Sequence, residues 1–391
     1  MPLLQFKFNK KIMVELPREI MDNIFSRLPV KLLLRFRCVS KLWCNIIDDP
    51  CLANMHRTQA SDEEPLVLLL LGFHDRTEMS SLYELEDNRG VLRPITSNKQ
   101  PLLNLESKET ENGIEQYYLQ SFCKGLLCIS SLSKVILSNP LRKESLILPP
   151  VTLEYKSMPN FESYGLGFDT STNMYKAVHV FYKEIDFDTM RYKLGTQVYS
   201  LGSTSWREIS STPSYPIWKP IYVNEAIHWI ADTRFEIDNL KGMIVSFDIG
   251  KEEFQLTPHP AGIHIDSFHP CYLINLRRDL AIVESQSCSA SVVIWVLKNW
   301  NTKQWVKEFS LYIAAPSMYL GNSYISSVCP SEGGLIFKDG GTSTVAHYKL
   351  ASDEVEWYKI CKLTGSKRMD LLQVFSFKGS LISLKSYGKL L

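Results

Sequence analysis

The sequence predicts a mainly β fold preceded by a small helical module, and two observations carry this prediction. Residues 13–50 contain no glycine and space their apolar residues every three or four positions, as helices do. After residue 50, a pair of short strands joined by a polar turn recurs six times at intervals near fifty residues, a period typical of a β-propeller with four-stranded blades. We therefore expect a three-helix module within residues 13–55, and then a six-bladed β-propeller over residues 65–391 that strands from both ends of the domain close.

The helical module is predicted from two apolar stripes. The first recurs every four positions and lines one face of a helix of about three turns; its members are Leu16, Ile20, Ile24 and Leu28. Pro17 suits the first turn of this helix, because proline lacks only an N–H that would have no partner there. Pro29 ends the helix and begins a second one over residues 30–37. The second stripe marks a third helix, which residues 48–50 close, and consists of Val39, Leu42, Trp43, Ile46 and Ile47.

These helices are too small to bury all of their large apolar side chains among themselves, because a unit of about forty residues lies below the size at which a core is self-sufficient. Some of this apolar surface must therefore contact something else. Periodicity alone leaves two alternatives open: the helices dock on the domain that follows, or they bind a different protein.

The segment LPREIMDNIFSRLPVKLLLRFRCVSKLWCNII closely resembles the F-box, because its Leu-Pro pairs, the run RFRCV and Lys41 with Trp43 stand at the spacing of that motif. The resemblance implies that an exposed apolar face binds the SKP adaptor, which links the chain to a cullin scaffold and its RING subunit. It also implies that a set of residues divides between the adaptor interface and the internal packing of the module. This set contains Leu16, Pro17, Ile20, Ile24, Leu28, Pro29, Leu32, Leu33, Phe36, Val39 and Trp43.

The β-rich remainder is predicted from two series of strands. The six hairpins have the anchors Tyr83, Leu137, Tyr199, Phe247, Trp295 and Tyr348, which lie 48 to 62 residues apart. Another short strand lies upstream of most hairpins, near residues 124, 164, 226, 280 and 333. A last strand, GSLISL from residue 379, has no hairpin after it, so we expect it to pair with residues 66–92 and close the ring. Closure would remove an exposed sheet edge.

Aromatic residues recur on the second strand of four hairpins, and we expect them to pack between blades: Trp206, Phe254, Trp305 and Trp357. A large β-sandwich is the alternative architecture, since short alternating strands also permit it. The regular period favours the propeller.

From about residue 65 to about residue 385, the sequence resembles the type 1, kelch-like F-box-associated domain of plant F-box proteins. The resemblance rests on CKGLLCI with LSNPLRKESLILPP, on YGLGFDTSTNMYKAV, on VYSLGSTSWREI, on AIHWIA with IVSFDIGKEEF, and on GGLIFKDGG. Within that family the sequence is most similar to S-locus F-box and S-locus F-box-like proteins. An insert from Lys183 to Lys193 departs from the family pattern and lengthens one blade.

Composition excludes several classes of protein. The chain has 391 residues, 43 Lys and Arg against 42 Asp and Glu, and 45% hydrophobic residues, which is typical of an ordinary globular protein. A nucleic-acid binder needs a strongly basic surface. The longest aliphatic run, residues 66–71, is far shorter than the ~20 residues that span a bilayer, and the nine cysteines form no C-x-x-C pair. We therefore expect no nucleic-acid partner, no membrane partner and a cytoplasmic or nuclear location.

Catalytic and metal-binding motifs are weak or missing. GLGFDT at residue 165 lacks the third glycine of a dinucleotide site, and GGTST at residue 340 lacks the lysine of a phosphate-binding loop. His259, His264 and His269 fall at intervals of five, a spacing that suits neither one helix face nor one strand face, so turn histidines are favoured over a metal cluster. His228 lies between apolar neighbours and is interpreted as a packed strand residue. We expect no catalytic residue, no metal and no cofactor.

The functional prediction is a non-catalytic adaptor: an F-box that binds SKP, and a propeller that recruits a protein for ubiquitination and proteasomal degradation. The S-locus resemblance sharpens this to a receptor for a style ribonuclease in self-incompatibility. The alternatives are a propeller enzyme or small-molecule binder, and a scaffold that does not direct degradation. The residues that bind substrate are not identified, and the search region is the loops near 155–163, 184–193, 213–220, 232–240 and 313–323.

Overall fold

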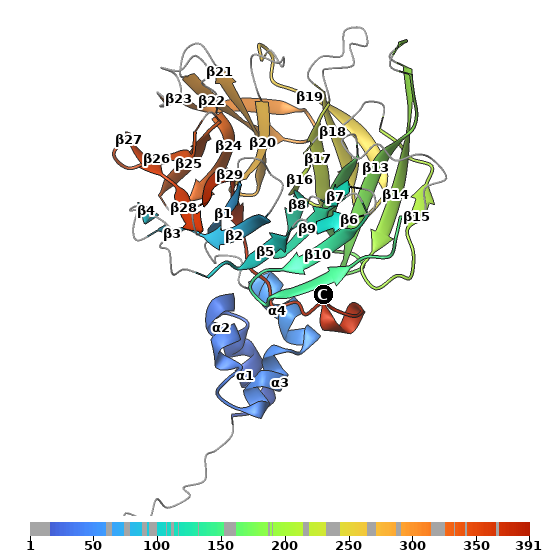
Figure 1. The fold of residues 1–391 in the computed structure, drawn as a ribbon, viewed down its shortest axis with the longest axis vertical. Helices are drawn as coiled ribbons and strands as arrows, with labels where there is room; N and C mark the ends of the chain where they lie inside the picture. The colour runs from blue at the N-terminus through green and yellow to red at the C-terminus, as the bar shows by residue number, and fades with distance from the viewer. Residues whose placement is uncertain are drawn as a thin grey trace, which may run out of the picture. The chain divides into compact units, whose positions relative to one another are not determined.

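The computed structural model describes residues 16–391 except 60–64, 74–78, 88–91, 94–99, 107, 111–112, 116, 132, 152–161, 187, 190, 214–218, 232–242, 264–270, 287–290, 314–324, 332, 341 and 365–366. The chain divides into two compact units, residues 1–63 and residues 64–391. Helices form the first unit and β-sheets form the second (Figure 1).

The first unit contains four helices: α1 (Arg18–Phe25), α2 (Val30–Phe36), α3 (Lys41–Ile47) and α4 (Pro50–Gln59). Proline residues precede the first two helices. The backbone of Pro17 is extended, with φ −50° and ψ 145°, and its carbonyl accepts the N–H groups of Ile20 and Met21 at 3.1 and 3.2 Å. Pro17 is therefore the N-cap of α1 and lies one position before the turn in which it was predicted. Pro29 is likewise the N-cap of α2.

Helix α1 is shorter than the predicted three turns. It has eight residues, so that Leu16 lies before its start and Leu28 lies after its end. A proline disfavours the helical conformation of the residue that precedes it, and the chain turns at residues 26–28 before Pro29. The four-residue spacing of the stripe therefore extends beyond the helix at both ends.

Helix α4 is a fourth helix that the sequence prediction missed. Asp49 opens it, because its Oδ1 accepts the N–H of Cys51 at 2.8 Å and its carbonyl accepts the N–H of Ala53 at 3.2 Å. Pro50 is the first residue of the helix, a position that suits proline. The pair Asp49-Pro50, interpreted as the end of one helix, is instead the beginning of the next.

The second unit is a six-bladed β-propeller, as predicted, and not a β-sandwich (Figure 1). Blade 1 contains β28 (Cys361–Thr364), β29 (Lys367–Phe377), β1 (Leu66–Phe73), β2 (Met79–Glu84) and β5 (Leu103–Glu106). Blade 2 contains β8 (Tyr118–Cys123), β9 (Leu126–Ser130), β10 (Val135–Asn139) and β11 (Glu144–Ile147). Blade 3 contains β12 (Ser163–Asp169), β13 (Met174–Asp186), β14 (Arg191–Ser200) and β15 (Arg207–Ile209).

Blades 4 to 6 repeat the same antiparallel order. Blade 4 contains β16 (Ile221–Val223), β17 (Ala226–Ile230), β18 (Met243–Asp248) and β19 (Glu253–Pro258). Blade 5 contains β20 (Cys271–Leu276), β21 (Asp279–Gln286), β22 (Ser291–Asn299) and β23 (Gln304–Tyr312). Blade 6 contains β24 (Ile325–Ser331), β25 (Gly334–Asp339), β26 (Thr344–Lys349) and β27 (Glu354–Lys359). Neighbouring blades contact each other through the strands β8, β12, β16, β20, β24 and β29 in turn, so these are the inner strands of the ring.

Strands from both ends of the domain close the ring, as predicted. Strand β1 pairs antiparallel with β29, in a register that runs from Leu66 opposite Phe377 to Phe73 opposite Met369. The predicted partner, GSLISL from residue 379, is not a strand. This segment follows β29 and is held instead by side chains of blade 2, among them Asn139, whose Nδ2 donates to two of its carbonyls.

The first predicted hairpin, around Tyr83, is also different in the structure. Strand β2, which contains Tyr83, pairs with β5. The residues between these two strands include a separate two-stranded ribbon, β3 (Glu86–Asp87) with β4 (Leu92–Arg93). A second such ribbon, β6 (Lys108–Thr110) with β7 (Gly113–Glu115), follows β5. The outer strand of blade 1 therefore lies about ten residues later than the repeat predicted.

The recurring aromatic residues pack between blades, as predicted. The indole Nε1 of Trp206 in blade 3 donates to the carbonyl of Pro149, which follows blade 2, at 2.9 Å. Trp305 in blade 5 donates in the same way to Pro258 in blade 4, also at 2.9 Å. Phe254 packs in an apolar cluster that blades 3 and 4 share, and Trp357 packs in one that blades 5 and 6 share.

The predicted loops fall mostly outside the described residues. The insert from Lys183 to Lys193 is described except at residues 187 and 190, and it extends the hairpin of β13 and β14, with Glu184 opposite Lys193 and Asp186 opposite Arg191. This two-stranded extension is visible in green in Figure 1. The insert therefore lengthens a pair of strands and does not form an irregular loop.

Candidate functional site

The helical unit has a compact core of its own. Met21 and Phe25 on α1, Leu33 on α2, and Ile46 and Ile47 on α3 are buried, the last three with 0% exposure. The ring of Phe25 lies 5.0 Å from that of Trp43, and Phe36 lies 5.3 Å from Trp43, both edge to face. Such aromatic contacts add to the stabilisation that burial of the rings provides. The core thus joins the first three helices.

Met21 and Phe25 were not identified in the sequence as core residues. They form an i, i+4 pair that lies one position after Ile20 and Ile24. The stripe Leu16, Ile20, Ile24 matched the helical period equally well and contains more aliphatic residues. A helix with apolar residues on two neighbouring faces needs more than one partner, and this is the signal that could have identified the pair.

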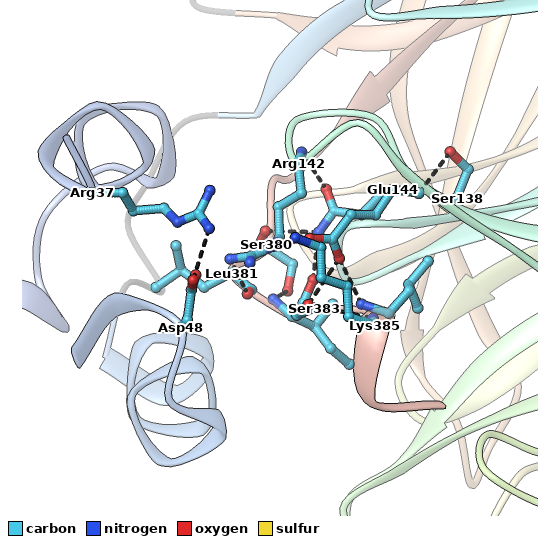
Figure 2. A network of polar contacts seen from close by, with 12 residues as sticks. Arg37, Asp48, Ser138, Arg142, Glu144, Ser380, Leu381, Ser383 and Lys385 are labelled. Carbon is cyan, nitrogen blue, oxygen red and sulfur yellow. Dashed lines mark hydrogen bonds and ion pairs between the residues drawn. The ribbon is translucent and has the colours of Figure 1, made fainter. Parts of the chain in front are cut away.

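Ion pairs and hydrogen bonds fix the ends of the helices. Arg18 donates to Asp22 at 3.1 Å and to Asp49 at 2.6 Å, so it connects the start of α1 with the start of α4. Arg37 pairs with Asp48 at 2.7 Å (Figure 2). The N–H of Cys51, and then the side chain of Arg18, hold the pKa of Asp49 below its usual value. These contacts fix the positions of the helices from which the apolar side chains project.

His56 connects α4 with the rest of the helical unit. Its ring is buried, and Nε2 donates to the carbonyl of Leu28 at 2.8 Å. Leu52 and Ala53 of the same helix are also buried. The fourth helix is therefore part of the packed unit.

Five large apolar side chains of this unit are exposed to solvent. The exposed fractions are 49% for Leu16, 46% for Ile20, 46% for Ile24, 60% for Val39 and 40% for Leu42. None of them belongs to the buried residues of the core described above. Ile20 and Ile24 lie four residues apart on α1 and are therefore neighbours on its surface. Contiguous exposed apolar side chains mark a protein-binding surface.

The eleven residues predicted to bind or support the adaptor fall into three groups. Leu16, Pro17, Ile20, Ile24, Pro29 and Val39 are exposed. Leu28, Leu32, Phe36 and Trp43 are half-buried, and Leu33 is fully buried. Leu42 is exposed as well and was noticed in the second stripe, but it was not included in the predicted set. Exposed residues are available to bind the adaptor, and buried ones pack inside the module, so both kinds of residue that the prediction requires are present. Which residues contact the adaptor stays a prediction.

The histidines singled out in the propeller have different surroundings. His264 and His269 lie outside the described residues, and the Nδ1 of His259 contacts the carbonyl of Pro260 at 2.7 Å. His228 is a packed strand residue, as predicted, with 0% exposure. Within the described ranges no group of three or more His, Cys, Asp or Glu side chains is arranged to hold a metal ion. No helix in the described part of the chain combines the length and apolar character needed to cross a bilayer.

Two protein families match this chain, one in each unit. The F-box domain family matches residues 13–54, and the family described as the F-box associated beta propeller domain matches residues 77–367. F-box protein CPR1 of Arabidopsis thaliana is 24% identical over 76% of this chain and 73% of its own length. F-box protein At1g53790 of the same plant is 26% identical over 93% of this chain and 78% of its own length. Among solved structures, a chain of the nidogen/laminin complex has a TM-score of 0.44 at 10% identity, and the match covers 79% of this chain and 98% of that chain.

Proposed function

Because this chain belongs to the F-box proteins that carry an F-box associated β-propeller domain, we propose that it is the substrate-recognition subunit of an SKP–cullin–F-box ubiquitin ligase. In this proposal residues 13–55 bind the SKP adaptor, and residues 65–391 recruit a protein substrate for ubiquitination and degradation. Cullin and the RING subunit join through the adaptor. The chain needs no cofactor for this role and acts in the cytoplasm or the nucleus.

The observation that carries the proposal is the set of exposed apolar side chains on a helical unit that has a buried core of its own. Burial of a whole Leu, Ile or Val side chain stabilises a contact by about 1.5–3 kcal/mol before the costs of association are subtracted. About half of each of these side chains is already covered, so each still offers about 1 kcal/mol to a partner. Five such side chains are sufficient anchors for an apolar groove on another protein.

The proposed mechanism is positional and involves no acid, base or nucleophile from this chain. One unit binds the adaptor and the other binds the substrate, so a lysine of the substrate is held near the charged ubiquitin-conjugating enzyme. Tethering of this kind raises the effective concentration of the two reactants to the millimolar range for short linkers. It accelerates the transfer without any new catalytic group.

Adaptor binding is tested by introducing charge at Ile20 and Ile24, two of the five exposed apolar side chains. The double variant Ile20→Asp with Ile24→Asp should bind purified SKP adaptor at least about 30-fold more weakly, because it removes about 2 kcal/mol of apolar contact and buries two carboxylates. Both side chains are nearly half exposed, so the unit should still fold. Isothermal titration calorimetry measures the affinity, and circular dichroism confirms the fold.

The matched control is Val306→Asp with Tyr312→Asp on β23 of the propeller. These side chains are 40% and 70% exposed, and the pair introduces the same number of carboxylates. We expect the control to bind the adaptor as the unchanged chain does. Unchanged affinity in the folded Ile20/Ile24 variant would contradict the assignment of this surface.

The narrower hypothesis is that the substrate is a style ribonuclease of a self-incompatibility system. It rests on the resemblance of the propeller motifs to S-locus F-box proteins. Direct capture of purified style ribonuclease by the full chain would support it, and failure to bind would remove it without affecting the role in the ligase.

The two rival functions predict different outcomes. A propeller enzyme or small-molecule binder would not co-precipitate with SKP and cullin. A scaffold without a role in degradation would co-precipitate with them, but its bound proteins would keep the same half-life when the chain is deleted.

A further inference from the structure

Three polar side chains of blade 2 bind residues 380–384, and we call this binding site the seat: Asn139, Arg142 and Glu144. Asn139, at the end of β10, has 0% exposure, and its Nδ2 donates to the carbonyls of Ser380 and Ile382 at 3.0 and 2.9 Å. Arg142, in the turn that follows, donates to the carbonyl of Leu381 at 3.2 Å. Three successive carbonyls of the C-terminal segment are thus bound by two side chains.

Glu144 at the start of β11 completes the seat. Its carboxylate accepts the N–H of Leu384 at 2.7 Å and the hydroxyl of Ser383 at 2.9 Å, and it pairs with Arg142 at 3.1 Å (Figure 2). The side chains of Arg142 and Glu144 are 1% and 5% exposed. Charge-assisted hydrogen bonds in such buried positions are stronger than those on a surface.

The segment also fits the backbone of neighbouring turns. At Gly125, which has φ +88°, a Cβ atom would lie 2.6 Å from the backbone nitrogen of Ser380, so only glycine fits beneath the segment. Further on, the N–H of Leu391 donates to the carbonyl of Ser145 at 2.9 Å, and Leu390 forms a bridge with Leu146. These contacts therefore involve residues 380–384 and 390–391, whereas residues 385–389 between them are exposed.

Most of these hydrogen bonds are made to backbone groups of the segment, and its apolar side chains make the remaining contacts. Leu381, Ile382 and Leu384 are 2%, 8% and 0% exposed. The combination of hydrogen bonds to the backbone and a few buried apolar side chains is the chemistry by which proteins bind a peptide. The segment has no strand pairing with β10 or β9, which distinguishes it from the blade itself.

We propose that blade 2 carries a peptide-binding site whose ligand is the chain's own C-terminal segment, Ser380–Leu391. The segment acts as a clasp that binds reversibly and fixes β29, the strand that precedes it and closes the ring. The site is independent of adaptor binding. Its ligand class is a peptide with apolar residues at Leu381, Ile382 and Leu384, followed by the short 3-10 helix η3 (Lys385–Tyr387).

The first test uses the full chain with the cleavage sequence of a site-specific protease inserted between Lys378 and Gly379. After cleavage, the released fragment should stay bound through gel filtration, because its contacts do not require the covalent link. A fluorescent synthetic peptide of residues 379–391 should replace it and show saturable binding by fluorescence polarisation. A cleaved protein that keeps its circular dichroism spectrum but loses the fragment and binds no peptide would overturn the proposal.

Asn139→Asp is the variant that isolates the seat. The Oδ1 of Asn139 also accepts the N–H of Arg142 at 3.3 Å within its own turn. Asp248 serves the same turn in blade 4, where its Oδ1 accepts the N–H of Gly250 at 3.0 Å. Aspartate therefore suits the turn. It cannot donate the two hydrogen bonds to the carbonyls of Ser380 and Ile382, however, and it places a carboxylate next to these carbonyls. We expect the labelled peptide to bind at least about tenfold more weakly.

Asn299→Asp is the matched control, because Asn299 opens the corresponding turn of blade 5 and its Oδ1 accepts the N–H of Asn301 at 2.9 Å. If cleavage at the inserted site unfolds the chain, limited trypsin digestion of the uncleaved protein is used instead. The measured quantity is the rate at which trypsin cuts after Lys385 and Lys389. Asn139→Asp should raise the rate of cleavage there at least about tenfold, and Asn299→Asp should leave it unchanged. Equal rates in the two variants would overturn the proposal.

Discussion

His228 in blade 4 lies where a neutral side chain fits and a charged one does not. Its Nε2 donates to the carbonyl of Val223 at 3.1 Å, so its Nδ1 accepts the hydroxyl of Ser246 at 2.8 Å. Both ring nitrogens are thus paired in the neutral form. Burial disfavours the imidazolium and lowers the pKa of His228 from 6.5 to about 4.

This burial makes the stability of the propeller depend on pH. The unfolded chain binds a proton at His228 below pH 6.5, whereas the folded chain does so only near pH 4, so the free energy of unfolding falls as the pH is lowered through this window. At about 1.4 kcal/mol for each pKa unit, the contribution of His228 is about 3 kcal/mol. In His228→Gln the decrease between pH 7 and pH 4, measured by urea denaturation, should be smaller by that amount. An unchanged decrease would show that other groups cause it.

A buried charge cluster joins the strands of blade 3 to the turn between β18 and β19 of blade 4. The Nζ of Lys176 on β13 lies 3.0 Å from Asp169 on β12 and 3.0 Å from Glu252 in that turn. Burial alone would raise the pKa of Asp169, but hydrogen bonds from Ser171, Lys176 and Thr172 outweigh it and hold this pKa well below its usual value. The cluster is therefore fully ionised at neutral pH.

Lys176→Met should lower the free energy of unfolding by about 2–4 kcal/mol, because it leaves the carboxylate of Asp169 buried without its cation, although Glu252 keeps its pair with Arg207 at 2.7 Å. The control is Lys298→Met in blade 5, where the lysine also pairs with two carboxylates, Asp279 at 3.3 Å and Glu308 at 3.0 Å. The side chain of Lys298 is 43% exposed, against 9% for Lys176, so its loss should change stability by less than about 1 kcal/mol. Chemical denaturation compares the two, and equal losses would contradict the role of burial.

Elements differed in how well the sequence predicted them. The hairpins at Leu137, Tyr199, Phe247, Trp295 and Tyr348 were predicted correctly, because each joins two consecutive strands by a short turn and needs only local information. Helix α4 and the outer strand of blade 1 were missed or misplaced. Asp49-Pro50 fits the end of a helix as well as the start of one, and strand β5 follows an insertion that no local period could reveal.

At the scale of the whole molecule, ring closure was predicted correctly but the closing strand was not. GSLISL has the composition of a strand, yet its polar backbone groups pair with the side chains of Asn139, Arg142 and Glu144. Which of two neighbouring apolar segments pairs with β1 depends on contacts with blade 2, more than two hundred residues away. A local sequence pattern does not predict contacts between residues so far apart in the chain. The four-residue spacing of Ile20 and Ile24 on α1, in contrast, can be recognised from the local sequence.

Closure by β29 makes blade 1 different from the other five blades. In blades 2 to 6 the paired strands follow one another along the chain, so a strand that detaches stays tethered to its partner. Strand β1 and its partner β29 are instead more than 290 residues apart along the chain, and their contact must close a very long loop. Phe377 at the end of β29 is 1% exposed and packs in an apolar cluster shared with Leu127 and Ile136 of blade 2.

Phe377→Ala should therefore open the ring locally before the rest of the propeller unfolds. Removal of a buried Phe side chain costs about 3–5 kcal/mol, and hydrogen exchange followed by mass spectrometry should show faster exchange in β1, β29 and blade 2 than in blades 4 and 5. Phe337→Ala is the matched control, because Phe337 is 0% exposed and packs between blades 5 and 6. Its loss should lower global stability by a similar amount without selective exchange in blades 1 and 2. If both variants show the same pattern of exchange, β29 is not the weak point of the ring.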